Sequence, residues 1–186
     1  MSGFAAYEPG MGRRAAKSAI SVRAGRAEDL EVCAELIVSR AGGDAGERRE
    51  RLLGDLEDPD RYVAVACAGS GVDEQVVGYG GVIRHELLPE HPAGTAPSGY
   101  YLIGLIVKPE WRRCGIGDLL TVERMRWTAE RADTIWSFAN IANRAILDLH
   151  RRFGFEEVTR DFSFPDAPLQ PGTVVLLRAA LERVPG

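Results

Sequence analysis

Two kinds of hydrophobic pattern alternate along the chain. Short apolar or alternating runs predict strands, whereas apolar residues at three- and four-residue steps predict helices. The predicted strands are Ala19–Arg23, Arg61–Ala68, Gln75–Arg84, Gly99–Val107, Thr134–Ala139, Phe155–Thr159 and Thr173–Leu177. The predicted helices are Glu28–Arg40, Ala45–Leu56, Gly115–Arg131 and Ala142–Phe153. This order predicts a single α/β domain over residues 19–186, a mixed sheet with helices on both faces, preceded by a disordered arm at residues 1–18.

The same pattern distinguishes central from peripheral elements. Gly99–Val107 is the most apolar strand, so we expect it at the centre of the sheet. The helix Gly115–Arg131 is expected to bury one apolar stripe. The members of that stripe are Ile116, Leu119, Val122, Met125 and Ala129. The connection Glu86–Ser98 is long for a compact domain and rich in proline, so we expect it to contact a substrate.

Composition and charge exclude several classes of protein. Hydrophobic residues make up 45% of the chain and charged residues 27%, which is typical of a soluble globular protein. The net charge of −4 and the pI near 5.5 argue against nucleic-acid binding. The longest apolar run, Tyr100–Val107, is too short to cross a membrane. The cysteines show neither zinc-binding spacing nor a disulfide framework. We therefore expect a cytoplasmic protein that holds no metal ion.

The segment between the apolar strand and the next helix carries the strongest chemical signal. A helix N-terminus presents unpaired N–H groups and the positive end of a dipole, which suits a phosphate. Gly115 and Gly117 allow the backbone to approach a diphosphate, and Arg112 and Arg113 add positive charge at the rim. Leu120 stands where a dinucleotide-binding fingerprint has its third glycine, and no P-loop lysine is present. The alternative interpretation is a tight strand-to-helix turn without a ligand.

Two motifs in this order resemble the GNAT superfamily of N-acetyltransferases. The first is Arg-x-x-Gly-x-Gly at residues 112–117, after an apolar strand. The second lies one helix and one strand further on and comprises Asn143, Leu147, Leu149, His150 and Phe153-Gly154-Phe155. The resemblance spans about Ala19 to Leu181. It implies a mixed, mostly antiparallel sheet with splayed central strands, flanked by helices.

The resemblance also implies how acetyl-CoA binds. The strand residues Leu105, Ile106 and Val107 would pair with the pantetheine arm, and the Leu105 N–H would face the thioester carbonyl oxygen. Asn143 would hydrogen-bond the donor from the later helix. The backbone N–H groups expected to hold the diphosphate are those of Arg113, Cys114, Gly115, Ile116, Gly117 and Asp118.

Transfer in this superfamily is usually direct, so the amine must lose a proton and the CoA sulfur gains one. His150 stands where the family often has a tyrosine acid, and Tyr101 stands where some members have a glutamate base. Glu86, with His85, Glu90 and His91 in or beside the long loop, offers further bases. The alternatives are that His150 only packs beside its neighbours or caps the helix, that Tyr101 is a core aromatic, and that the loop carboxylates are merely solvated.

The function that follows is transfer of the acetyl group of acetyl-CoA to an amine, with a small molecule as the expected acceptor. The acidic chain favours a cationic acceptor such as a polyamine or aminoglycoside. A peptide or protein amine is an alternative acceptor. A non-catalytic acyl-CoA-binding module is the alternative from another class, because the strand glutamate and the helix tyrosine of the family are both replaced here. A homodimer is compatible with the sequence, and no nucleic-acid or membrane partner is expected.

Overall fold

The computed structural model of the chain describes residues 19–165, 167 and 169–182, and the arm expected at residues 1–18 lies outside them. One mixed sheet with the strand order β1-β2-β3-β4-β5-β7-β6 organises the described chain. Its strands are β1 Ile20–Ala24, β2 Arg61–Ala68, β3 Gln75–His85, β4 Gly99–Val107, β5 Thr134–Asn140, β6 Glu156–Thr159 and β7 Val174–Ala180. Neighbours are antiparallel except for β4 and β5. The apolar strand Gly99–Val107 is central, as predicted.

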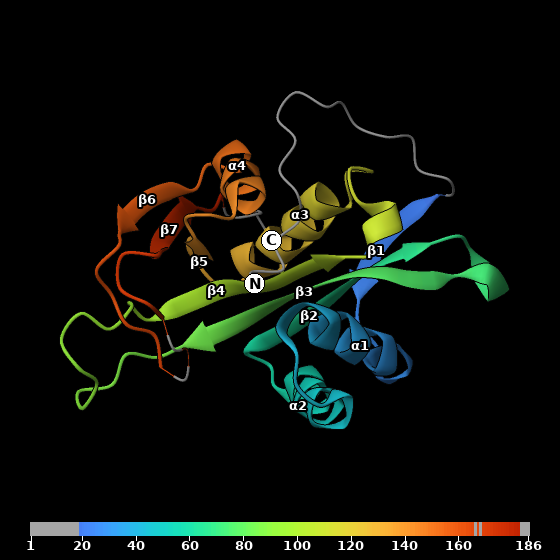
Figure 1. The fold of residues 1–186 in the computed structure, drawn as a ribbon, viewed down its shortest axis with the longest axis horizontal. Coiled ribbons are helices and arrows are strands. Elements are labelled where there is room, and N and C mark those ends of the chain that lie inside the picture. The colour runs from blue at the N-terminus through green and yellow to red at the C-terminus, as the bar shows by residue number, and fades with distance from the viewer. Residues whose placement is uncertain (1–18, 166, 168, 183–186) are drawn as a thin grey trace.

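Helices cover both faces of this sheet, which confirms the predicted layers (Figure 1). They are α1 Leu30–Ala41, α2 Ala45–Glu57, α3 Ile116–Ala129 and α4 Arg144–Arg152, and short 3-10 helices span Ala27–Asp29, Gly71–Asp73 and Pro109–Trp111. Helices α1 and α2 lie on one face, and α3 and α4 lie on the other (Figure 1). Under α1, buried Leu30 and Leu36 pack against Val65 of β2. Each buried leucine contributes roughly 2 kcal/mol through its apolar surface.

The central strands part halfway along their length. The parallel pairing of β4 and β5 covers only Tyr100–Leu102, although β4 continues to Val107. Opposite, the register of β4 on β3 shifts between Tyr79 and Gly81, which is a β-bulge at Gly104 and Leu105. Gly104 has a φ of +56° and a Cβ there would lie 2.9 Å from the Tyr79 ring. The bulge therefore requires glycine, and the strand beyond it is released from β5.

Helix α3 buries a different face from the one predicted. Leu119 and Val122 are 43% and 51% exposed. The buried row instead contains Ile116, Leu120, Arg124 and Thr128 at four-residue spacing. Apolarity alone misassigned this face because its polar members satisfy their hydrogen bonds locally, as when Thr128 Oγ1 donates to the Arg124 carbonyl at 2.9 Å. Ile116 and Ala129 are buried as predicted.

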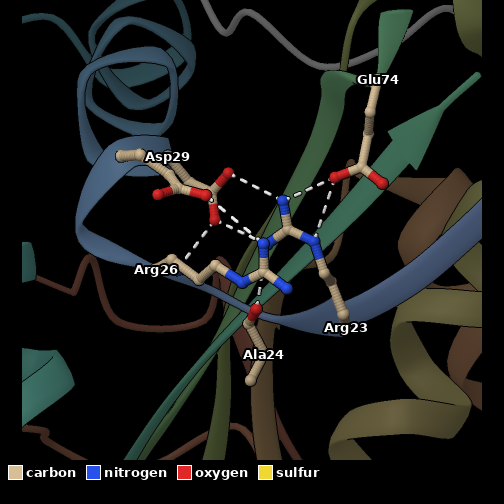
Figure 2. A network of polar contacts seen from close by, with 6 residues as sticks. Arg23, Ala24, Arg26, Asp29 and Glu74 are labelled. Atoms are coloured by element: carbon tan, nitrogen blue, oxygen red, sulfur yellow. Dashed lines mark hydrogen bonds and ion pairs between the residues drawn. The ribbon is translucent and has the colours of Figure 1, made fainter. Parts of the chain in front are cut away.

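A polar network fastens β1 to the start of α1 and to the β2–β3 connection (Figure 2). The Arg23 guanidinium donates to both Asp29 oxygens at 2.7 and 3.0 Å and to Glu74 at 2.8 Å. The Arg26 N–H donates to the Asp29 carboxylate at 2.8 Å. Burial alone would raise the pKa of Asp29, but these hydrogen bonds outweigh it and hold that pKa below its usual value. Asp29 is consequently a buried carboxylate whose charge stabilises the folded state.

We expect Arg23→Met to lower the free energy of unfolding near neutral pH by about 1 kcal/mol. Because the folded pKa of Asp29 is depressed, the stabilisation is present above the unfolded pKa of about 4 and is lost as the pH falls through the folded pKa. The difference between variant and wild type should therefore shrink in urea titrations below about pH 4. Arg26→Met is the matched control, since its side chain pairs with exposed Glu28 at 3.3 Å and its charge is the smallest of the influences on the pKa of Asp29. A pH-independent difference would contradict the assignment to Asp29.

Candidate functional site

A cavity of about 890 Å³ follows the gap where β4 leaves β5, and we call it the larger cavity. Its wall is formed by β4, the end of β5, α3, α4, the C-terminal end of α1 and Arg48 of α2. The basic residues that line it are Arg40, Arg48, Lys108, Arg112 and Arg124, and no carboxylate side chain is among the described lining residues. Burial, and secondarily the charge of Arg112, lower the pKa of Arg40. A chain of net charge −4 thus concentrates positive charge in one cavity, which suits a polyanion.

The N-terminus of α3 lies at the end of the strand that borders this cavity. Its cap residue Gly115 has a φ of +82° and makes no side-chain cap hydrogen bond. By contrast, α2 and α4 are capped by the side chains of Asp44 and Asn143. Arg113 has a φ of +67°, a conformation that is uncommon for a residue with a Cβ. Two residues of this turn are thus left-handed, and the first N–H groups of α3, as at any helix start, have no acceptor within the helix.

The structure gathers the predicted donor-binding residues at one end of the fold. Leu105, Ile106, Val107, Arg112 and Asn143 line the larger cavity. The remaining ones form the adjacent turn and the first turn of α3; they are Arg113, Cys114, Gly115, Ile116, Gly117 and Asp118. Arg112 Nε donates to the Val107 carbonyl at 3.2 Å, which holds the turn against the strand end. An ion pair between Asp118 and Arg152 joins α3 to α4.

His150 projects from α4 into the same cavity and is only 3% exposed. Its ring lies 4.6 Å from that of Phe155, centroid to centroid. Burial, and secondarily the charge of Arg124, lower the pKa of His150 to about 4. The imidazole is therefore neutral at pH 7, and within the described part of the chain its Nδ1 has no hydrogen-bond partner. A neutral imidazole donates one hydrogen bond and accepts another, so it remains able to serve the CoA sulfur.

Tyr101 and Glu86 do not join His150. Tyr101 is fully buried in an aromatic cluster, its hydroxyl donates to the Pro97 carbonyl at 2.6 Å, and burial raises its pKa. Glu86 is exposed on the loop that follows β3. Neither residue lines the larger cavity or the smaller one described next. His85 Nε2 lies 3.0 Å from the Ala96 carbonyl oxygen of the same loop.

A second cavity of about 270 Å³, the smaller cavity, lies against the bulge of β4 on the α1–α2 side. It shares Arg40 and Arg48 with the larger cavity and adds Arg51 and Asp55. Asp55 is already engaged by Arg61 at 2.7 Å. Arg48 and Arg51 both lie on α2. Their spacing of three residues on a helix placed both on one side, but only the tertiary structure shows that this side faces a cavity.

Arg124 is a further residue that the sequence analysis did not single out. It lines the larger cavity beside His150 and is 1% exposed. The one available signal was its position eight residues after Ile116, on the row that α3 buries.

Over the described ranges, no helix is long and apolar enough to span a bilayer. No group of three or more His, Cys, Asp or Glu side chains suited to a metal ion occurs in that part of the chain either.

Comparison with known proteins gives a consistent family and fold. The sequence model described as the Acetyltransferase (GNAT) family matches residues 30–155. No curated protein sequence matches the chain. A ribosomal-protein-alanine N-acetyltransferase from Brucella melitensis is 20% identical, with a TM-score of 0.64 over 87% of this chain and 99% of that one.

Two further solved structures show the same fold at similar distance. A phosphinothricin acetyltransferase from Sinorhizobium meliloti in complex with AcCoA is 17% identical, with a TM-score of 0.64 over 87% of this chain and 88% of that one. A spermidine N-acetyltransferase chimera from Vibrio cholerae and hSSAT is 15% identical, with a TM-score of 0.62 over 87% and 95%. At these identities the likeness establishes the fold, and the three names describe three different acceptors.

Proposed function

Because this chain belongs to the GNAT acetyltransferase family, we propose that it transfers the acetyl group of acetyl-CoA to the amino group of a small molecule. One observation carries the proposal. The larger cavity is positively charged, runs along the released part of β4 and lies beside the uncapped N-terminus of α3. A thioester carrier has a long neutral arm, which can pair with the free edge of a strand, and an anionic end, which can bind at a helix N-terminus and near positive charge. The Sinorhizobium relative, which is in complex with AcCoA, supports the same donor.

The residues that would hold this donor divide by chemistry. The backbone of Leu105, Ile106 and Val107 would pair with the arm, because β4 has left β5 there. The N–H groups at residues 113–118 would bind the diphosphate, with Arg112 adding charge beside them. Asn143 already caps α4 by accepting from the Ile146 N–H at 3.4 Å, so its amide NH₂ would be the group turned to the donor.

Acetyl-CoA supplies an activated acyl carbon in its thioester. We assign to His150 the hydrogen bond to the departing sulfur, which a neutral imidazole N–H donates. The Leu105 N–H at the bulge would stabilise charge on the thioester oxygen. Tyr101 and Glu86 stay predictions as bases, and either would act only through water, since neither lines the larger cavity.

The smaller cavity is the proposed site of the acceptor, because it meets the larger one at Ile103, Gly104 and Leu105. Because arginines line this cavity, we propose an amine that also carries a carboxylate or a similar anion, in place of the cationic acceptor expected from the net charge. The charge of this cavity outweighs the net charge of the chain, since Coulomb energies fall with distance and are screened by salt. Its volume of about 270 Å³ favours a small molecule over a folded protein surface.

The test follows free CoA thiol while purified protein receives acetyl-CoA and one amine at a time, with amino acids, polyamines and short peptides as the panel. We expect thiol release that depends on the amine and is faster for amino acids than for polyamines. Arg48→Met should raise KM for the amino acid and leave affinity for the polyamine unchanged or improved. If the protein bound CoA but acetylated none of the amines in the panel, the proposed enzymatic activity would be rejected in favour of a non-catalytic acyl-CoA-binding module.

A further inference from the structure

Arg124 is a buried cation to which no carboxylate of residues 19–165, 167 and 169–182 is paired. Within the described chain it forms no salt bridge, and its residue is 1% exposed. Burial lowers its pKa to about 10, which leaves the guanidinium charged at neutral pH. Buried arginines are ordinarily paired with an anion, because an unbalanced charge in a low-dielectric interior is costly.

The hydrogen bonds of Arg124 do not exhaust its donors. Its Nε donates to the Leu120 carbonyl at 3.0 Å, and Nη1 donates to the carbonyls of Ile103 at 3.1 Å and Gly81 at 3.4 Å. Nη2 makes one bond, at 3.4 Å, to Thr121 Oγ1. A guanidinium has two hydrogens on that nitrogen, so one Nη2–H lacks an acceptor among the described residues. The acceptors of the Arg124 guanidinium are thus neutral carbonyl and hydroxyl groups. Its remaining N–H is available to hydrogen-bond an anion.

The backbone opposite is shaped around this side chain. A Cβ on Gly80 would lie 3.0 Å from both Arg124 Cζ and Nε, which is closer than such atoms normally approach. Gly80 and Gly81 follow each other in β3, a strand that is otherwise rich in β-branched residues. An apolar residue at position 124 would fill the space under α3 without an uncompensated charge, so filling space alone does not account for the arginine.

The position of Arg124 in the cavity tells which part of a ligand it would meet. It lines the larger cavity together with Leu102, Ser137 and His150, where β4 and β5 begin to part. Its bond to the Ile103 carbonyl places it next to the bulge at Gly104 and Leu105, where the proposed function locates the thioester. His150 Nδ1 is a second buried polar atom without a partner here. An acetyl methyl group would leave the remaining Arg124 N–H without an acceptor, whereas a carboxylate would pair with Arg124.

We propose that the enzyme prefers an acyl-CoA whose acyl group ends in a carboxylate, as in a malonyl or succinyl thioester, and that Arg124 binds this carboxylate. The inference rests on the acyl transfer of the proposed function and gives that reaction an anionic acyl-CoA as its preferred donor in place of acetyl-CoA. During transfer the amine nitrogen forms a bond to the thioester carbon, and the carbon–sulfur bond breaks with its electron pair going to sulfur. The amine loses one proton and the departing sulfur gains one to become the CoA thiol, while the distal carboxylate is unchanged.

The test compares succinyl-CoA with butyryl-CoA, which has the same number of acyl carbons and no charge, by calorimetric titration of the full chain. We expect succinyl-CoA to bind at least about tenfold more tightly, on the scale of one charge-assisted pair. In Arg124→Met this preference should vanish while free CoA binds as before. Arg124→Lys keeps the cation and should retain part of the preference, which provides a second variant if the methionine protein folds poorly.

The outcomes separate this inference from the function beneath it. Equal affinities in the wild-type protein, or a preference that survives in Arg124→Met, would overturn the role of Arg124 and leave the acyltransferase intact. Failure of the wild-type protein to bind free CoA would instead reject the proposed function. The affinity for butyryl-CoA in both variants is the readout of a merely structural role, since a packing defect would weaken the charged and the uncharged donor alike.

Discussion

Gly117→Asp is expected to weaken CoA binding on the order of 100-fold, because it would place a carboxylate against the diphosphate. A Cβ at Gly117 would lie 3.7 Å from Leu105 Cδ2 and from Leu149 Cδ2. Both leucines line the larger cavity, so a side chain at residue 117 faces the side on which we propose that the donor binds. Two negative groups within about 4 Å repel by roughly 1–4 kcal/mol in a half-solvated site. Calorimetric titration with CoA measures the effect directly.

The change is informative because it should not harm the fold. Residue 117 lies in the first turn of α3, where an acidic side chain interacts favourably with the helix dipole. The melting temperature without CoA should therefore stay level or rise. Gly117→Ala is the matched control, since its methyl group meets only ordinary van der Waals contacts there, and it should bind CoA nearly as well as the wild type. Equal affinity of the aspartate variant would show that the diphosphate binds elsewhere.

Patterns among residues close together in the sequence were sufficient to predict most of the fold. The strands Arg61–Ala68 and Gly99–Val107 have the predicted bounds, because both are continuous apolar runs between clear breaks. Gly115 and Gly117 were predicted to let the backbone approach a phosphate, and of the two Gly115 has a φ of +82°, a conformation that a side chain disfavours. Such features depend on residues close together in the sequence.

What the sequence did not reveal depends on partners far apart along the chain. The buried face of α3 was misassigned in part because Arg124 finds acceptors in β3 and β4, the carbonyls of Gly81 and Ile103, which no periodicity reports. The smaller cavity requires α2 to lie against the bulge at Gly104. The expectation of a cationic acceptor followed from the net charge of the whole chain, whereas the proposed acceptor would meet the charges that line the smaller cavity. Local charge, not composition, decides which ligand fits.

The electrostatics of the larger cavity also change how His150 would act. A histidine of ordinary pKa would be half protonated near pH 6.5, which suits a general acid. Burial and the neighbouring Arg124 instead lower the pKa of His150 to about 4. The charged form is therefore nearly absent at neutral pH, and any help to the sulfur comes from a neutral N–H. The same cation that is proposed to bind an anionic acyl group thus keeps the imidazole neutral.

His150→Phe should accordingly lower kcat at least about tenfold, a barrier increase of about 1.4 kcal/mol, with CoA affinity unchanged. The phenyl ring would occupy the apolar contact with Phe155, so the fold should be kept. His150→Gln is the matched control, because its amide retains an N–H donor, and it should lose less activity.

Because His150 stays neutral, the ratio of wild-type to His150→Phe turnover should be constant between about pH 6 and pH 8. A ratio that falls as the pH rises through about 6.5 would mean that an imidazolium is the acid, and an unchanged kcat would remove His150 from the reaction altogether.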